Sequence, residues 1–238
     1  MKVLTFAPML FSRIAYRHLS VPPCYYKPIG GQQDYVRILN DNDVDLVVCN
    51  GPAGTGKTLF ACQMALETLD SGRRKNIVIT RPTVSTERDL GALPGDIDSK
   101  LSPWVRPIVD AMGEFKSKSA IGNLMNSGTL EIAPLAFMRG RTFKNAVVIA
   151  DEMQNSTPDQ MKMLLTRLGE DSKLIITGDV EQCDHKGPNG LADLISRLGD
   201  HFDHDADAMG SSGICIVTLE GCDIQRSALV KTIVEVYK

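Results

Sequence analysis

Short apolar runs alternate along this chain with stretches in which apolar residues recur at helical spacing. Five runs that are apolar or β-branched predict buried strands, at residues 46–50, 76–80, 146–150, 173–177 and 214–219. Residues 130–133 predict a smaller strand. Because helical patterns separate these runs, the order predicts parallel strands joined by crossover helices. The fold class is therefore α/β, with a mainly parallel sheet flanked by helices.

Three segments carry helix signals. A mixed apolar and polar stripe follows residue 58 and predicts a helix that ends near Ser71. Thr157 precedes Pro158, a pair typical of a helix beginning at the proline. The last helix is expected from about Gln225 onward. The glycine-, aspartate- and serine-rich stretch 200–213 predicts a loop.

A glycine-rich segment lies between the first predicted strand and the first predicted helix. It matches the pattern GxxxxGK[ST] with Gly51, Pro52, Ala53, Gly54, Thr55, Gly56, Lys57 and Thr58. Glycines let the backbone curl so that its N–H groups point at a β-phosphate, and the helix N-terminus adds its positive dipole end. Lys57 is expected to reach the β- and γ-phosphates, and Thr58 to offer its hydroxyl to Mg²⁺. The segment predicts a P-loop that binds ATP with Mg²⁺.

Two carboxylates follow the predicted strand at 146–150. Mg²⁺ keeps several of its waters, so one carboxylate at a strand end, Asp151, suffices to hold it beside Thr58. Glu152 is then placed to orient or deprotonate an attacking water. An apolar run ending in two acids usually means only a strand reaching solvent. The P-loop in the same chain favours the functional interpretation.

Polar residues also follow two other predicted strands. In a parallel sheet, ligands collect outside the carboxyl ends of the strands, so Asp179 and Gln182 are expected near the γ-phosphate, where Gln182 can sense it. The alternative for this segment is an ordinary turn. Arg81 ends another strand, where it either meets phosphate or pairs with a surface carboxylate.

Several arginines are candidates for phosphate contacts. Arg139 and Arg141 flank Gly140 just ahead of the acidic strand, and guanidinium groups on glycine-flanked loops suit bidentate phosphate binding. Arg226, at the start of the last predicted helix, is a further arginine-finger candidate. A surface salt bridge is the alternative for each of them.

Composition narrows the class of protein. The 238 residues suffice for one substantial core, and the net charge of −3 excludes a strongly basic surface, so a polynucleotide site must be local. Six scattered cysteines without a CxxC pair indicate thiols in a reducing compartment. No apolar run is long enough to span a bilayer. These features predict a soluble, cytoplasmic protein without a membrane partner.

Two segments have ambiguous composition. Residues 1–30 contain basic but no acidic residues, so organelle targeting is the alternative to an N-terminal extension that packs on a single domain at 31–238. A cluster in the stretch 200–213 resembles a metal site but lacks the spacing of one, and is expected to be solvated: His201, Asp203, His204, Asp205 and Asp207.

Taken together, the motifs resemble the PhoH-like ATPase family from about Gln32 to Tyr237. The matching segments are 51–58, 80–82, 90–95, 134–142, 151–155, 160–163, 165–169, 178–182 and 229–230. Two departures are Met153, where the family usually has alanine, and the polar residues 183–185. Neither removes a catalytic group.

The resemblance carries several expectations. It implies a RecA-like core similar to that of superfamily 1 helicases, an ATPase with RNA or DNA unwinding activity, and a link to phosphate starvation. It also implies that Gln32 lies where the helicase Q motif contacts adenine. Because the chain has only one RecA-like lobe, we expect a homo-oligomeric ring, a hexamer as the resemblance implies, in which Arg139, Arg141, Arg167 or Arg226 reaches a neighbour's nucleotide.

Three outputs of hydrolysis are open at this point. A nucleic-acid motor is favoured by the helicase-like motifs but disfavoured by the acidic pI and the few aromatic residues. The alternative is a switch or scaffold ATPase that acts on a protein partner without nucleic acid. A small-molecule phosphotransferase fits least, because paired carboxylates suit water activation better than selection of an acceptor hydroxyl.

Overall fold

A parallel sheet forms the centre of the molecule, for which a computed structural model describes residues 26–83, 97–184, 187–225 and 236. Its six strands follow the order β3-β2-β4-β5-β1-β6, and every neighbouring pair is parallel. The strands are β1 (Leu46–Asn50), β2 (Asn76–Arg81), β3 (Leu130–Pro134), β4 (Ala146–Ala150), β5 (Lys173–Gly178) and β6 (Ile214–Thr218). All six predicted strands are confirmed, each to within one residue at either end.

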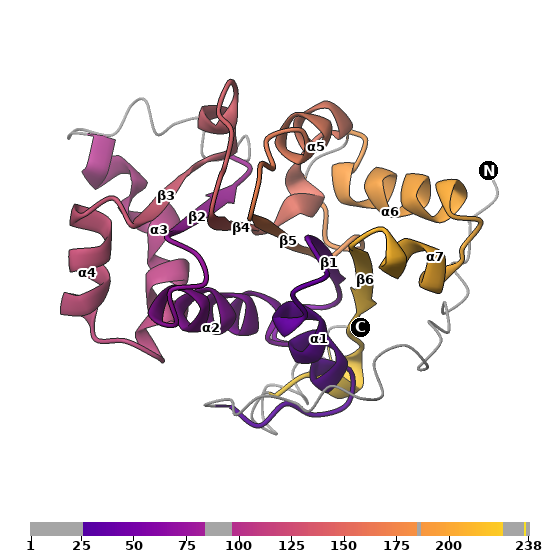
Figure 1. Cartoon of the computed structure of the whole chain (residues 1–238), viewed down its shortest axis with the longest axis horizontal. Helices are drawn as coiled ribbons and strands as arrows, with labels where there is room; N and C mark the ends of the chain where they lie inside the picture. The colour runs from indigo at the N-terminus through magenta and orange to yellow at the C-terminus, as the bar shows by residue number, and fades with distance from the viewer. Residues whose placement is uncertain (1–25, 84–96, 185–186, 226–235, 237–238) are drawn as a thin grey trace.

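Helices cover both faces of the sheet, so the domain has three layers (Figure 1). One face packs against α1 (Gly31–Asn40), α2 (Lys57–Asp70), α3 (Ile97–Gly113) and α4 (Lys118–Asn126). The other packs against α5 (Pro158–Leu165), α6 (Gly190–His201) and α7 (Ala206–Ser211). Successive strand residues alternate between the two cores, as Val47 and Val48 do, because side chains in a strand point to opposite faces. The predicted α/β class with flanking helices is confirmed.

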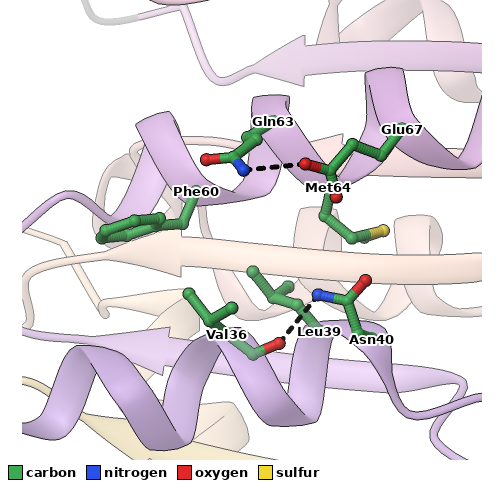
Figure 2. A pocket seen from close by; sticks show the side chains of 7 residues that line it. All are labelled: Val36, Leu39, Asn40, Phe60, Gln63, Met64 and Glu67. Atoms are coloured by element: carbon green, nitrogen blue, oxygen red, sulfur yellow. Dashed lines mark hydrogen bonds between the residues drawn. The ribbon is translucent and has the colours of Figure 1, made fainter. Parts of the chain in front are cut away.

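Helix α1 packs directly on α2, the helix that follows the P-loop. Val36 and Leu39 of α1 face Phe60 and Met64 of α2 across a shallow pocket, as Figure 2 shows. All four side chains are buried in the same core cluster. The beginning of α2, where a phosphate site is expected, is therefore held by apolar contacts with a helix on the same face of the sheet.

The helix predictions had different outcomes. Helix α2 ends at Asp70 with Ser71 as its C-cap, and α5 begins at Pro158 with a capping box between Thr157 and Gln160, so both are confirmed. The helix expected from Gln225 lies almost wholly outside the described residues. In the part of the chain that the structure describes, no helix is long and apolar enough to cross a membrane.

The loop predicted at 200–213 is wrong. Residues Ala206–Ser211 form α7, which buries Met209, and α6 extends to His201. The side chain of Asp205 accepts hydrogen bonds from the amides of Asp207 and Ala208, so it caps α7. Aspartate favours helix caps as well as turns, and here the acidic residues that suggested a loop begin a helix.

The strand order determines which side chains meet. Strand β5 lies between β1, which leads into the P-loop, and β4, which leads into Asp151. All strands are parallel, so their carboxyl ends share one edge of the sheet, where ligands of open α/β sheets bind. Short 3₁₀ helices follow three strands: η2 (Leu135–Met138) after β3, η3 (Met153–Asn155) after β4 and η4 (Gly221–Asp223) after β6.

Candidate nucleotide site

The P-loop curls between the end of β1 and the first residue of α2. Gly54 and Gly56 have φ of 85° and 86°, a left-handed conformation that residues with a Cβ rarely adopt. The Nζ of Lys57 donates to the carbonyls of Gly51 and Pro52 at 2.6 and 3.0 Å, so the amine lies over the loop. The segment has the backbone form and the helix N-terminus that anion binding requires.

Gln32 braces the P-loop from α1. Its amide Nε2 donates to the carbonyls of Thr55 at 3.0 Å and Asp223 at 2.7 Å. Its Oε1 accepts from the amide of Ile29 at 3.0 Å and from Nε2 of Gln225 at 3.2 Å. The side chain is 1% exposed, and both ends of its amide are engaged. The adenine contact that the resemblance implies stays a prediction, and it requires the amide to release one of these partners.

Thr58 and Asp151, which are 93 positions apart in sequence, meet at the carboxyl edge of the sheet. The Thr58 hydroxyl donates to Asp151 Oδ1 at 2.7 Å. Asp151 is 1% exposed and comes directly after the fully buried strand β4. A hydroxyl and a carboxylate are hard oxygen ligands, the donor set that Mg²⁺ prefers, so these two residues fit a magnesium ion beside the P-loop.

Two further side chains hold the Asp151 carboxylate. The hydroxyl of Thr177, at the end of β5, donates to Oδ1 as Thr58 does. Arg81, at the end of β2, donates from Nε and Nη2 to Oδ2 at 2.8 and 2.6 Å. The sequence offered a phosphate or a surface carboxylate as partners of Arg81. The structure instead pairs it with the buried carboxylate of the predicted metal site.

Glu152 is connected to the neighbouring strand end through Gln154. Glu152 has φ of 56°, and its side chain is 49% exposed, which leaves it accessible to water. Gln154, which is buried, donates to Glu152 Oε2 at 2.6 Å, while its own Oε1 accepts from the amide of Asp179 at 3.1 Å. A Cβ at Gly178 would lie 2.6 Å from that Oε1, so the strand end has to be glycine for the amide to approach. Sequence reasoning assigned no role to Gln154 or Thr177.

Of three other predicted residues, the structure describes two, Gln182 and Arg139. Gln182 is exposed on the turn that follows Asp179, and its backbone N–H donates to the backbone carbonyl of Asp179 at 3.0 Å. Arg139 is exposed and forms no ion pair with any described residue. Arg226 lies outside the described residues.

Arg141 and Arg167 have partners within the chain. Arg141 donates to both carboxylate oxygens of Glu131 at 2.5 and 2.6 Å and lies 5.1 Å from the ring centre of Phe143. The hydrogen bond with Glu131 raises the pKa of Arg141 above its ordinary value. Arg167 donates to the carbonyls of Met163 and Arg141. For Arg141 the predicted salt-bridge alternative describes what the structure contains.

Comparison with known proteins supports the family suggested by these motifs. The family model described as "PhoH-like protein" matches residues 28–238. A PhoH-like protein of Bacillus subtilis (strain 168) is 46% identical over 209 residues, which cover 87% of this chain and 62% of the relative. Protein PhoH of Escherichia coli (strain K12) is 41% identical over 194 residues, or 81% of this chain and 52% of that protein. The chain thus spans between half and two thirds of the length of these relatives.

Similar solved structures are more distant. The large terminase of a thermophilic bacteriophage has a TM-score of 0.45 and 14% identity, covering 83% of this chain and 45% of its own. The Pif1 helicase of Candida albicans has a TM-score of 0.37 and 16% identity, covering 82% and 40%. Both likenesses are low, so the fold assignment depends on the sheet order and the P-loop. On the family match and the identity to its relatives, the chain belongs to the PhoH-like protein family.

Proposed function

We propose that this chain hydrolyses ATP with Mg²⁺ and couples hydrolysis to the binding or unwinding of RNA or DNA. The observation that carries the proposal is the contact between Thr58 and Asp151, because it brings a P-loop hydroxyl and a strand-end carboxylate together at 2.7 Å. Either residue alone has an ordinary structural explanation. Their meeting across 93 positions, beside a glycine-rich loop at a helix N-terminus, is the arrangement that a magnesium–nucleotide site requires.

The chain's own residues then take these roles. The P-loop amides and Lys57 hold the phosphates, while Thr58 and Asp151 hold Mg²⁺, which supplies positive charge to the phosphate oxygens when it is bound. Glu152 orients or deprotonates the attacking water, and its half-exposed carboxylate is accessible for that role. Gln182, exposed on the turn after β5, senses the γ-phosphate.

An arginine from a neighbouring subunit completes the site in a homo-oligomeric ring, which we take to be a hexamer. Arg139 is the best candidate among the described arginines, because it is exposed and lacks the carboxylate partner that Arg141 has. An isolated monomer with full ATPase activity in size-exclusion chromatography would contradict this part of the proposal.

One surface feature favours nucleic acid over a protein partner as the regulator of hydrolysis. Phe137, on η2 at the carboxyl edge of the sheet, is 61% exposed, and Arg139 follows it on the same turn. An exposed aromatic ring beside a cation suits the stacking and charge of a single strand. We expect Phe137→Ala to reduce stimulation of ATPase activity by RNA and to leave basal turnover unchanged.

The decisive experiment is an ATPase assay of the full chain with and without single-stranded RNA, at two salt concentrations. Lys57→Ala and Glu152→Gln are both expected to lose turnover by about 100-fold or more. Glu152→Gln should still bind nucleotide, since its phosphate and metal ligands are intact. Equal loss of nucleotide binding in both variants would refute the role of Glu152. Turnover that ignores RNA at both salt concentrations would favour the switch that acts on a protein partner.

A further inference from the structure

The Asp151 carboxylate has no acceptor site left. An ionised carboxylate offers about four lone-pair sites. Two hydroxyls, from Thr58 and Thr177, occupy Oδ1, and the Nε and Nη2 groups of Arg81 occupy Oδ2. Protein donors therefore use all of these sites.

This saturation matters for the proposed magnesium site, on which the following inference rests. Mg²⁺ in proteins keeps several of its waters, and those waters donate to nearby carboxylates. A saturated Asp151 accepts no additional donor and contributes no direct ligand unless one of its present partners leaves. A guanidinium at this position also repels a divalent cation, because it carries a positive charge a few ångströms from where the metal would be held.

Arg81 is the partner that can leave. Thr58 can continue to donate its hydrogen to Asp151 while its oxygen faces a metal, and Thr177 is fully buried at the end of β5. The Arg81 side chain is 15% exposed and has a second acceptor nearby, since its Nη2 lies 3.9 Å from Glu152 Oε1. Moving from one carboxylate to the other leaves the guanidinium charge compensated.

We propose that Arg81 is a resident cation that competes with Mg²⁺ for Asp151 and moves toward Glu152 and the terminal phosphate when a magnesium–nucleotide complex binds. In the absence of metal, Arg81 neutralises a carboxylate that would otherwise be a buried, unpaired charge. A nucleotide gives the displaced guanidinium a new anionic partner. Metal and nucleotide therefore bind cooperatively, and the metal alone binds weakly. Arg81 is in this sense a positioning residue for both carboxylates.

The test measures Mn²⁺ binding to the full chain by electron paramagnetic resonance, with and without ADP. Mn²⁺ alone should bind Arg81→Gln about tenfold more tightly than the wild type, the effect expected for removing one positive charge near a divalent ion. Arg81→Lys, which keeps the charge, should restore the weak binding. Arg197→Gln serves as the matched control, because it removes an arginine–aspartate pair on the surface of α6 and should leave Mn²⁺ binding unchanged.

The outcomes separate this inference from the proposed function. Unchanged or weaker Mn²⁺ binding by Arg81→Gln overturns the competition, even where the wild type binds Mn²⁺ with ADP and hydrolyses ATP. Wild-type protein that binds nucleotide no better than Lys57→Ala overturns the proposed function itself.

A second measurement does not depend on a folded Arg81→Gln variant. In the ¹⁵N spectrum of the wild-type chain, the Arg81 Nε–H signal is identified by its absence from the spectrum of Arg81→Lys. We expect saturating Mg²⁺ and ADP to shift this signal, because the Nε group loses its bond to Asp151 Oδ2. A signal that stays in place under saturation also overturns the proposal.

Discussion

Charged side chains are buried both at the edge of the sheet where the strands end, the carboxyl edge, and at the edge where they begin, the amino edge. The hydrogen-bond partners of these side chains differ between the two edges. At the carboxyl edge, Asp151 is held by the hydroxyls of Thr58 and Thr177 and by the guanidinium of Arg81, and Arg81 can exchange partners because Glu152 lies nearby. At the amino edge, buried Lys173 donates to the backbone carbonyls of Leu39 and Asp41 at 2.9 and 2.6 Å. The Leu39 carbonyl lies in the last turn of α1, and Asp41 is the C-cap of that helix.

This difference indicates which edge can do chemistry. Side chains that share acceptors can rearrange when a ligand arrives, whereas a cation bound to helix-terminal carbonyls stabilises a fixed structure. We therefore expect changes at the carboxyl edge to alter turnover, and changes at the amino edge to alter the free energy of unfolding alone. Four substitutions test the contrast, and a fifth, Arg139→Gln, serves as a comparison for the last of them.

Gly178→Ala should have the largest effect. The new Cβ would lie 2.6 Å from Gln154 Oε1 and 2.7 Å from Leu191 Cδ2, in the buried interior of the sheet. Overpacking of this kind costs about 1–3 kcal/mol. Because Gln154 also holds Glu152, turnover of the folded fraction should fall by tenfold or more. Urea unfolding and ATPase assays of the same preparation measure the two effects. A destabilised variant with wild-type turnover per folded molecule would separate Gln154 from catalysis.

Gln154→Met tests the same link without a clash. Methionine has a similar length but cannot donate to Glu152 or accept from the Asp179 amide, so the general base loses its orientation. We expect kcat to fall about tenfold with little change in KM, since the phosphate-binding residues are untouched. Loss of the buried hydrogen bonds should lower the free energy of unfolding by about 1–3 kcal/mol. A rise in KM at constant kcat would mean that Gln154 acts on nucleotide binding instead.

Part of this site could be predicted from the sequence because its residues lie in short motifs or directly after a strand. The P-loop residues have a fixed spacing, and Asp151 follows an uninterrupted buried strand, so parallel topology alone brings both to one edge. The strands were predicted well for the same reason: each is a short apolar run between polar turns. Similarly, Thr157 predicts the start of the helix at Pro158, because its hydroxyl accepts a hydrogen bond from the backbone amide of Gln160, only three residues away.

Residues whose role depends on distant partners could not be predicted. Thr177 is an ordinary strand residue until β5 is placed between β1 and β4, and Gln154 gains its role only because Gly178 allows its amide to approach. Two interpretations of Arg81 were open from the sequence, and neither identified its partner Asp151, which is 70 positions away. The loop predicted at 200–213 was wrong for another reason: aspartate, glycine and serine are common at helix caps as well as in loops.

Lys173→Met probes the amino edge through the pH dependence of stability. Burial lowers the pKa of Lys173 from 10.5 to about 8 in the folded chain. Between these values the unfolded chain binds more protons, so the wild type gains stability as pH rises, by about 1 kcal/mol between roughly pH 7.5 and 9. The variant should lack this gain. Buried Cys49 and Cys62, whose thiol pKa values are raised, oppose the gain equally in both proteins.

The measurement for Lys173 is urea unfolding across that pH range, with the difference between wild type and variant as the readout. Turnover per folded molecule should be the same in both proteins, because Lys173 is at the opposite end of β5 from Thr177. Parallel stability curves for the two proteins would mean that Lys173 does not titrate in this window. A loss of turnover beyond the loss of folded protein would contradict the contrast between the edges.

Arg141→Gln should have the smallest effect, because it removes an ion pair that is partly exposed to solvent. The ion pair of Arg141 with Glu131 is about as short as that of Arg81 with Asp151. The side chains of Arg141 and Glu131 are 36% and 39% exposed, whereas those of Arg81 and Asp151 are 15% and 2% exposed. Exposed pairs contribute roughly 0–1 kcal/mol, because water screens both charges. We expect a loss of stability within that range and basal turnover within about twofold of the wild type. Arg139→Gln, measured alongside, should lower turnover further if the exposed arginine is the one that reaches a neighbour. If Arg141→Gln lowers turnover more than Arg139→Gln does, the two hydrogen bonds between Arg141 and Glu131 must break in the assembled protein. Ion pairing within one chain would then not indicate which arginine reaches the neighbouring subunit.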